Sequence, residues 1–156
     1  MAIRIAIEIN RTFDVESDFI TVFDLLADVP ASASFFPKLD KLEPLGDNAY
    51  RWEMEKIGVD RHSIQTAYAC RYVPDRDAGT VTWSPIEGEG NGIVSGKWQL
   101  RENGDRQTHL VFKTQAELTL PLPALLKLAV SPIVKHEFNA LVDQYMRRLQ
   151  QHFNAA

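Results

Sequence analysis

This sequence of 156 residues has only one cysteine, no cluster of histidines and no excess of positive charge. The single cysteine, Cys70, excludes an internal disulfide bond, and nothing near it resembles a thiolate metal site. The four histidines are scattered: His62, His109, His136 and His152. None has a second ligand at a metal-binding spacing, because His136 and Glu137 are adjacent and would point apart on a helix. We therefore expect no bound metal ion and no cofactor.

Long apolar runs and basic clusters are absent as well. No apolar segment approaches the roughly 18 residues needed to span a bilayer. The segment Met1–Ile9 alternates and contains Arg4 and Glu8, so no signal peptide is expected. The formal net charge of −4 argues against a nucleic-acid partner, which would require Lys and Arg gathered on one face. These absences predict a cytoplasmic protein without a transmembrane segment. They leave its oligomeric state open.

In the first part of the chain, the spacing of the apolar residues changes once, from that of a strand to that of a helix. Isoleucine stands at every second position from Ile3 to Ile9, which is typical of a half-buried strand. Helical spacing follows from Phe19 to Leu26, with Ser17 or Asp14 available as N-cap. A second short helix is expected over Ala31–Phe36 and should end at Pro37.

Most of the remaining chain reads as strands separated by turn residues. Gly46-Asp47-Asn48, Gly58-Val59-Asp60 and Asn103-Gly104-Asp105 are typical turn sequences. The expected strands are Leu39–Leu45, Ala49–Ile57, Arg61–Val73, Thr80–Pro85, Ile93–Arg101 and Gln107–Leu120. With the first strand they predict an α+β fold with a curved antiparallel sheet of about six or seven strands. All 156 residues are expected to form one domain.

An amphipathic helix ends the sequence. Its apolar residues recur every three or four positions from Leu126 to Phe153. Ser131-Pro132 interrupts this pattern and reads as an N-cap followed by a first-turn proline. We therefore expect a break or kink near Ser131 within the segment Ala124–Phe153.

The order of a strand, two short helices, six strands and a long helix resembles the START-like superfamily. That superfamily has the helix-grip fold and includes birch-pollen-allergen-like, polyketide cyclase/dehydrase, lipid-transport and coenzyme-Q-binding proteins. The similarity covers nearly the whole chain and is carried by the following segments: Val22-Phe23-Asp24-Leu25-Leu26 with Asp28, Phe36-Pro37, Tyr50-Arg51-Trp52, Val81-Thr82-Trp83, Gly96-Lys97-Trp98-Gln99-Leu100 and Leu120-Pro121-Leu122-Pro123. The resemblance implies a hydrophobic cavity between the sheet and the C-terminal helix. It implies no single function, because carriers, sensors, cyclases and hydrolases share this scaffold.

Alternation predicts which side chains face that cavity. The apolar phase of the strands is rich in aromatic rings, which suits a flat or isoprenoid ligand. The expected ligand-pocket residues are Trp52, Met54, Tyr68, Trp83, Trp98, Phe112, Val130, Val134 and Phe138. Small residues on the same phase, Gly96 and Ala116, are expected to leave space beside the rings. For any one of these residues, ordinary core packing is the simpler interpretation.

The segment Gly88-Glu89-Gly90-Asn91-Gly92 superficially resembles a phosphate-binding loop. It leads into a strand, lacks a following Lys-Ser/Thr pair, and is flanked by the acidic side chain of Glu87. We expect a flexible hairpin loop at the mouth of the cavity.

Three functions remain open. The first is binding or carriage of a hydrophobic small molecule such as a lipid, a quinone or a polyketide-like compound. The second is a cyclase or dehydrase acting in the same cavity. Its catalytic residues are unknown, because only tyrosine and threonine supply polar groups on the inward phase. The third is a protein-interaction module using an apolar surface near Phe35-Phe36.

Overall fold

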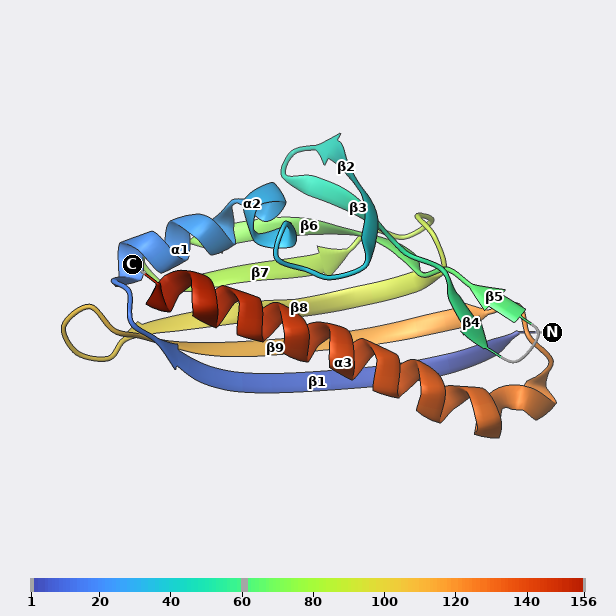
Figure 1. The fold of residues 1–156 in the computed structure, drawn as a ribbon. Coiled ribbons are helices and arrows are strands. Elements are labelled where there is room, and N and C mark those ends of the chain that lie inside the picture. The colour runs from blue at the N-terminus through green and yellow to red at the C-terminus, as the bar shows by residue number, and fades with distance from the viewer. Residues whose placement is uncertain (1, 60–61, 156) are drawn as a thin grey trace.

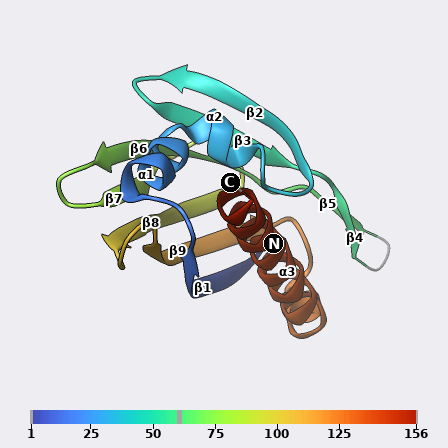
Figure 2. The same cartoon turned by 60° about the vertical axis from the view of Figure 1, so that its left-hand side comes forward.

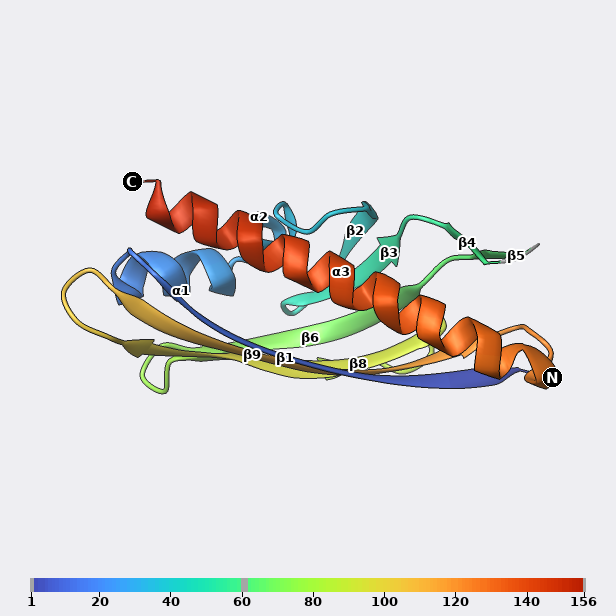
Figure 3. The ribbon, with the colours of Figure 1, turned by 60° about the horizontal axis from the view of Figure 1, so that its bottom comes forward.

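The computed structural model describes residues 2–59 and 62–155 of the chain. Its centre is a seven-stranded antiparallel sheet, with two short helices inserted after the first strand. The C-terminal helix α3 (Lys127–Asn154) lies along one face of the curved sheet (Figures 1 and 3). The predicted helix-grip architecture is therefore confirmed.

The strands of the sheet follow the order β1-β9-β8-β7-β6-β3-β2, so β1 and β2 form its edges. Their bounds are β1 (Ile3–Val15), β2 (Leu39–Gly46), β3 (Ala49–Met54), β6 (Ala67–Asp75), β7 (Thr80–Pro85), β8 (Gly92–Glu102) and β9 (Thr108–Leu120). β1 extends past Ile9 because it pairs with β9 along its whole length, up to the pair Val15–Thr108. A view turned by 60° shows the sheet curving around α3 (Figure 2).

Strand β1 has the predicted alternation. Ile3, Ile5, Ile7 and Ile9 are each at most 6% exposed, whereas the residues between them are exposed. Burial of one isoleucine side chain contributes about 1.5–3 kcal/mol. A register slip of one residue would turn all four toward solvent, so this pattern holds β1 in register against β9.

Helix α1 (Phe19–Ala27) begins at Phe19, where its predicted apolar spacing starts, but neither predicted cap is its N-cap. Asp18, not Ser17 or Asp14, is the N-cap, and it accepts hydrogen bonds from the backbone N–H and the hydroxyl of Thr21. The hydroxyl bond is the main cause of the lowered pKa of the Asp18 carboxyl. Val22, Phe23 and Leu26 form the buried face of α1.

Helix α2 (Val29–Ala33) starts before the predicted segment and ends before Phe36, so the bounds Ala31–Phe36 were wrong. Asp28 caps its N-terminus by accepting from the backbone N–H of Ala31. Pro30 lies in the first turn of the helix instead of preceding it. That position suits proline, whose missing N–H has no partner in a first turn.

Two predicted strands, Ala49–Ile57 and Arg61–Val73, are each divided in the structure. Their outer parts, β4 (Ile57–Val59) and β5 (His62–Ile64), form a separate two-stranded ribbon. The predicted start at Arg61 lies outside the described residues. Where the strands are divided, side-chain amides form hydrogen bonds with backbone N–H and C=O groups. Gln65 donates to the Met54 carbonyl, and Asn91 bonds both the Ala67 N–H and the Gln65 carbonyl.

Helix α3 is continuous from Lys127 to Asn154, so of the predicted break or kink near Ser131 the break was wrong. The irregularity lies earlier, in the 3₁₀ turn η1 (Ala124–Leu126). Pro132 is the sixth residue of α3, beyond the first turn that tolerates proline best. No described helix has an apolar stretch long enough to cross a membrane.

Replacing Pro132 with alanine is expected to raise the free energy of unfolding by about 1–3 kcal/mol. Alanine restores the N–H that can bond the carbonyl of Leu128 and removes the steric conflict of the ring. The gain should stay below the full helix-interior cost of proline because Leu128 is 91% exposed, which lets water reach this turn. Urea denaturation measures the difference. His136→Ala, one turn further at an exposed position, should change stability by less than about 0.5 kcal/mol. An unchanged or lowered stability of Pro132→Ala would show that the proline suits this turn.

Candidate functional site

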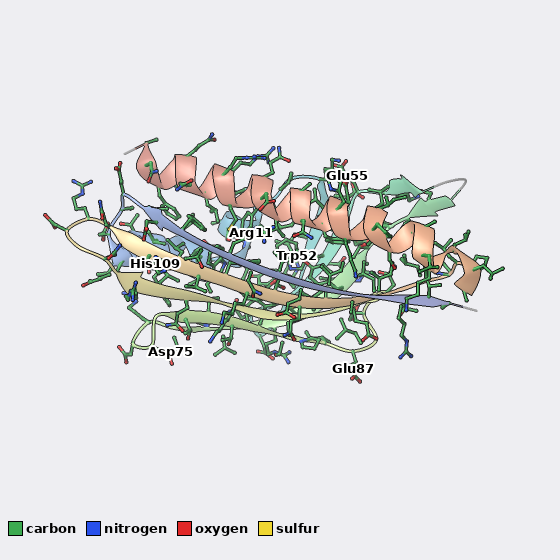
Figure 4. All side chains as sticks on the ribbon, turned by 90° about the horizontal axis from the view of Figure 1, so that it is seen from below. Arg11, Trp52, Glu55, Asp75, Glu87 and His109 are labelled. Atoms are coloured by element: carbon green, nitrogen blue, oxygen red, sulfur yellow. The ribbon has the colours of Figure 1, made fainter. Side chains whose placement is uncertain are left out.

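A cavity of about 100 Å³ lies between the sheet, the two short helices and α3. Six strands (β1, β3, β6, β7, β8 and β9) and all three α-helices contribute side chains to it, and Figure 4 places Trp52 between the sheet and α3. Asp75 and Glu87 lie on the outer side of the molecule in the same view. The lining side chains are Ile7, Ile9, Leu26, Val29, Ser32, Phe36, Trp52, Met54, Tyr68, Tyr72, Val81, Trp83, Val94, Trp98, Phe112, Thr114, Ala116, Phe138, Val142 and Tyr145.

The aromatic rings of the lining contact one another in a continuous series. Trp98 packs on Phe112 with ring centroids 4.9 Å apart, and Phe112 packs on Trp83 at 5.7 Å. Tyr145 of α3 meets Trp98 edge-on at 6.2 Å, which joins the helix to the sheet. Offset and edge-on pairs of this kind add about 0.5–1.5 kcal/mol each beyond area burial. The rings therefore form a well-packed wall around the cavity.

Seven of the nine predicted ligand-pocket residues line this cavity: Trp52, Met54, Tyr68, Trp83, Trp98, Phe112 and Phe138. The other two, Val130 and Val134, are 2% and 1% exposed and belong to the core without lining the cavity. They precede Phe138 by eight and four residues, which places them about 12 and 6 Å nearer the start of α3. The cavity is bordered by the middle of the helix, at Phe138, Val142 and Tyr145.

The space expected beside Gly96 does not exist. A Cβ atom at this position would lie 2.3 Å from the Lys113 carbonyl oxygen and 2.7 Å from two ring carbons of Trp83. The tryptophan ring covers the bare backbone of β8 and uses the room that the missing side chain provides. Ala116, in contrast, does line the cavity.

Four polar lining residues lie outside the predicted set, namely Ser32, Tyr72, Thr114 and Tyr145, and two of them, Ser32 and Tyr145, contact each other. Their side-chain hydroxyls bond each other across the gap between α2 and α3. Tyr145 lies seven residues after Phe138, two helical turns along the same face, so its position was predictable from the helical period. Ser32 carries no comparable signal, because its inward direction depends on where α2 starts.

No charged side chain and no histidine lines the cavity among the residues that the structure describes. Burial raises the pKa of Tyr145 to about 12, against the opposing effect of its hydrogen bonds with Ser32 and Trp98. Burial also raises the pKa values of Tyr68 and Tyr72 well above their ordinary value. The tyrosines that line the cavity therefore stay protonated at neutral pH and act as neutral hydrogen-bonding groups.

Cys70 lies behind the cavity wall. Its thiol donates to the Val94 carbonyl at 3.2 Å, and the residue is fully buried. Burial raises the pKa of this thiol to about 12, which leaves almost no thiolate at neutral pH. Cys70 therefore has the environment of a structural cysteine.

The glycine-rich loop between β7 and β8 does not lie at the cavity, since none of its residues belongs to the lining. It packs on the junction of β5 and β6 instead. The backbone N–H of Asn91 donates to the Ala67 carbonyl at 3.0 Å. Glu89 forms an ion pair with Arg51 at 3.3 Å. The expectation of a loop at the cavity mouth was wrong because Asn91 and Glu89 attach the loop to neighbouring strands.

Polar contacts join helix α3 to the edge strand β1, and Arg11 makes two of them. Arg11 donates to Asp143 at 2.6 Å and to Asn139 at 2.9 Å. Figure 4 shows Arg11 where β1 meets α3. A partly exposed ion pair of this kind contributes at most about 1 kcal/mol, so it orients the helix more than it stabilises the fold.

Within residues 2–59 and 62–155, no three side chains of histidine, cysteine, aspartate or glutamate come close enough to hold a metal ion. The site is thus defined by its apolar lining and its hydroxyl groups.

Solved structures with the same fold are readily found. The chain aligns with a START superfamily protein from Mycobacterium smegmatis at 15% identity, covering 94% of this chain and 96% of the other, with a TM-score of 0.65. A protein from Deinococcus radiodurans matches at 16% identity over 94% and 97% of the two chains, with a TM-score of 0.61. The Zhui aromatase/cyclase from a Streptomyces species matches at 19% identity over 92% and 88%, with a TM-score of 0.60.

These likenesses confirm the START-like fold of the chain, at the level of fold alone. No protein-family model matches the sequence, and no curated protein matches it. Function must therefore be inferred from the cavity itself.

Proposed function

We propose that this protein reversibly binds a compact hydrophobic small molecule in the cavity between the sheet and α3. The observation that supports the proposal best is the cavity lining, which is apolar and aromatic and includes no charged group among the described residues. Ligand sites of small molecules are generally concave and apolar, with a few polar groups that orient the ligand. Ser32, Tyr68, Tyr72 and Thr114 are such groups here.

The size of the cavity restricts the ligand. At about 100 Å³ it is smaller than the roughly 150 Å³ of an engineered apolar cavity that binds benzene. A single aromatic ring would enter after small side-chain movements. A long lipid or a polycyclic compound would require α3 or the short helices to move away from the sheet. The proposed ligand is therefore one ring in size, or a larger molecule that inserts only one ring.

A cyclase or dehydrase activity is the second candidate, favoured by the likeness of the fold to an aromatase/cyclase structure. General acid–base catalysis at neutral pH is most efficient with a group whose pKa lies near 7. The lining offers tyrosines with raised pKa values, including Tyr145 at about 12. This chemistry suits binding better than acid–base catalysis.

The interaction-module hypothesis finds less support. Phe36 packs on Tyr145 and Trp52 with ring centroids 5.1 and 5.9 Å apart. Phe35 packs on His152 at 5.0 Å. These rings are committed to contacts within the fold, so they do not form an exposed apolar surface.

Toluene is expected to bind at one saturable site. Titration of protein labelled at its methyl groups, followed by NMR, should shift the resonances of Ile9, Met54 and Val142, which line the cavity on β1, β3 and α3. Ile20, which is 53% exposed on α1, should not respond. The absence of any saturable shift up to the solubility limit of toluene would contradict the proposal. If toluene does bind, native mass spectrometry of protein purified from its own host would identify the natural ligand by its mass.

A further inference from the structure

One side of the cavity carries an ordered group of three aromatic residues. Trp52 and Tyr68 are direct cross-strand partners on β3 and β6, and their rings stack at 5.9 Å with an interplanar angle of 11°. The indole N–H of Trp52 donates to the hydroxyl oxygen of Tyr72 at 2.9 Å. All three side chains line the cavity.

The hydrogen bond from Trp52 determines what Tyr72 can still do. An indole nitrogen only donates, whereas a phenol has one donor hydrogen and two acceptor lone pairs. Trp52 therefore occupies an acceptor site of Tyr72 and leaves its O–H free to donate. Among the described residues, no acceptor is found for this O–H. Tyr145, by contrast, already has partners in Ser32 and Trp98.

Tyr68 supplies a second hydroxyl without a partner in the described part of the chain. No fully enclosed polar side-chain atom of that part lacks a hydrogen bond. The Tyr68 oxygen must therefore retain access to open space. Since Tyr68 is a lining residue, the cavity provides that space. Two phenol groups on one wall can thus interact with whatever occupies the cavity.

These donors are neutral. Burial raises the pKa values of Tyr68 and Tyr72 well above their ordinary value, so both keep their protons at physiological pH. A carboxylate or phosphate placed beside them would find no lysine, arginine or histidine among the described lining residues. Burial of an unpaired anion is strongly unfavourable. A hydrocarbon would avoid that cost but would leave the buried donor unpaired. An uncharged oxygen acceptor satisfies both conditions.

We propose that the hydroxyl of Tyr72, held in place by Trp52, donates a hydrogen bond to an uncharged carbonyl oxygen of an aromatic ligand. This inference rests on the proposed function and specifies its ligand class. The cavity then selects a neutral aromatic carbonyl compound over a carboxylate of the same size and over a hydrocarbon of the same shape.

Three probes of matched shape test the selection. Acetophenone carries the carbonyl, α-methylstyrene replaces the oxygen with a CH₂ group, and benzoate replaces the neutral group with an anion. The carbonyl stretch of acetophenone bound to the wild-type protein should lie at a lower frequency than in hexane, because a donated hydrogen bond weakens the C=O bond. Benzoate should bind at least tenfold more weakly than acetophenone.

Tyr72→Phe isolates the donor. It should lower the affinity for acetophenone five- to tenfold and return the carbonyl stretch toward its frequency in hexane, while the affinity for α-methylstyrene stays unchanged or rises. Tyr50→Phe is the matched control, because Tyr50 contacts the Tyr72 ring at 6.2 Å without lining the cavity. Tyr50→Phe should leave the acetophenone affinity and the frequency of the carbonyl stretch as in the wild type.

Two outcomes overturn the inference, and they differ in what else they overturn. If acetophenone and α-methylstyrene both bind but Tyr72→Phe changes neither the affinity nor the carbonyl stretch, the donor role is wrong and the binding function stands. If neither probe binds the wild-type protein, the proposed function fails and this inference fails with it.

Discussion

Replacing Gly96 with alanine is expected to lower the free energy of unfolding by about 3 kcal/mol. A Cβ atom at this position would come within 2.3 Å of the Lys113 carbonyl oxygen and 2.7 Å of the Trp83 ring. The carbonyl belongs to the backbone of the neighbouring strand β9 and cannot move without disturbing the sheet. The Trp83 ring is held between Phe112 and Tyr72 at 5.7 and 5.9 Å. The added carbon therefore cannot be accommodated without displacing the backbone of β9 or the Trp83 ring.

Gly58→Ala is the matched control. Gly58 also lies in a strand, but a Cβ atom there would meet no atom within 4 Å. Its replacement should change stability by less than about 0.5 kcal/mol. Equilibrium denaturation of both variants and the wild type measures the two changes in the free energy of unfolding. Equal effects at Gly58 and Gly96 would show that loss of chain flexibility, and not the contact with Trp83, explains the result.

Replacing Ala116 with leucine is expected to reduce toluene affinity at least tenfold while the protein remains folded. Ala116 lines the cavity from β9, opposite Ile7 on β1 and Val94 on β8. A leucine side chain would extend into the open volume that the ligand is proposed to use. Because it fills space that already exists, we expect a stability change of less than about 1.5 kcal/mol. Calorimetric titration and thermal unfolding of the same sample separate the two effects.

The same substitution at Ala6 provides a control on the other face of the sheet, because Ala6 is exposed on β1. Ala6→Leu should bind toluene like the wild type. If Ala116→Leu retained wild-type affinity, the ligand would bind elsewhere. A destabilisation of about 3 kcal/mol by Ala116→Leu would show that the interior near β9 is already filled.

Much of the fold was predictable because the strands bury one face, so that buried and exposed residues alternate along the sequence. Alternation at Ile3–Ile9 and in the strand containing Trp83 identified the inward phase, and that phase agrees with the observed burial. The order of the elements then led to the helix-grip architecture. The division at Gln65 was not predictable, because Asn91 causes part of it from a distant position in the sequence.

Local sequence was also a poor guide where packing decided between allowed alternatives. Ser131-Pro132 is a good helix start, yet α3 begins at Lys127 and includes the proline. Gly96 on the apolar phase suggested free space, but the space holds the ring of Trp83. In both cases the local pattern allowed two outcomes, and the outcome predicted from it was not the one that the structure has.

The measurement that tests the binding hypothesis most directly is a set of nuclear Overhauser effects between toluene and the protein methyl groups. The hypothesis predicts effects from the toluene methyl and ring protons to Ile7, Val94 and Val142, which lie on β1, β8 and α3 around the cavity. It predicts none to Leu125 or Leu128, which are 93% and 91% exposed. Effects confined to those exposed leucines, with none to the cavity methyl groups, would contradict the hypothesis that this cavity is the functional site.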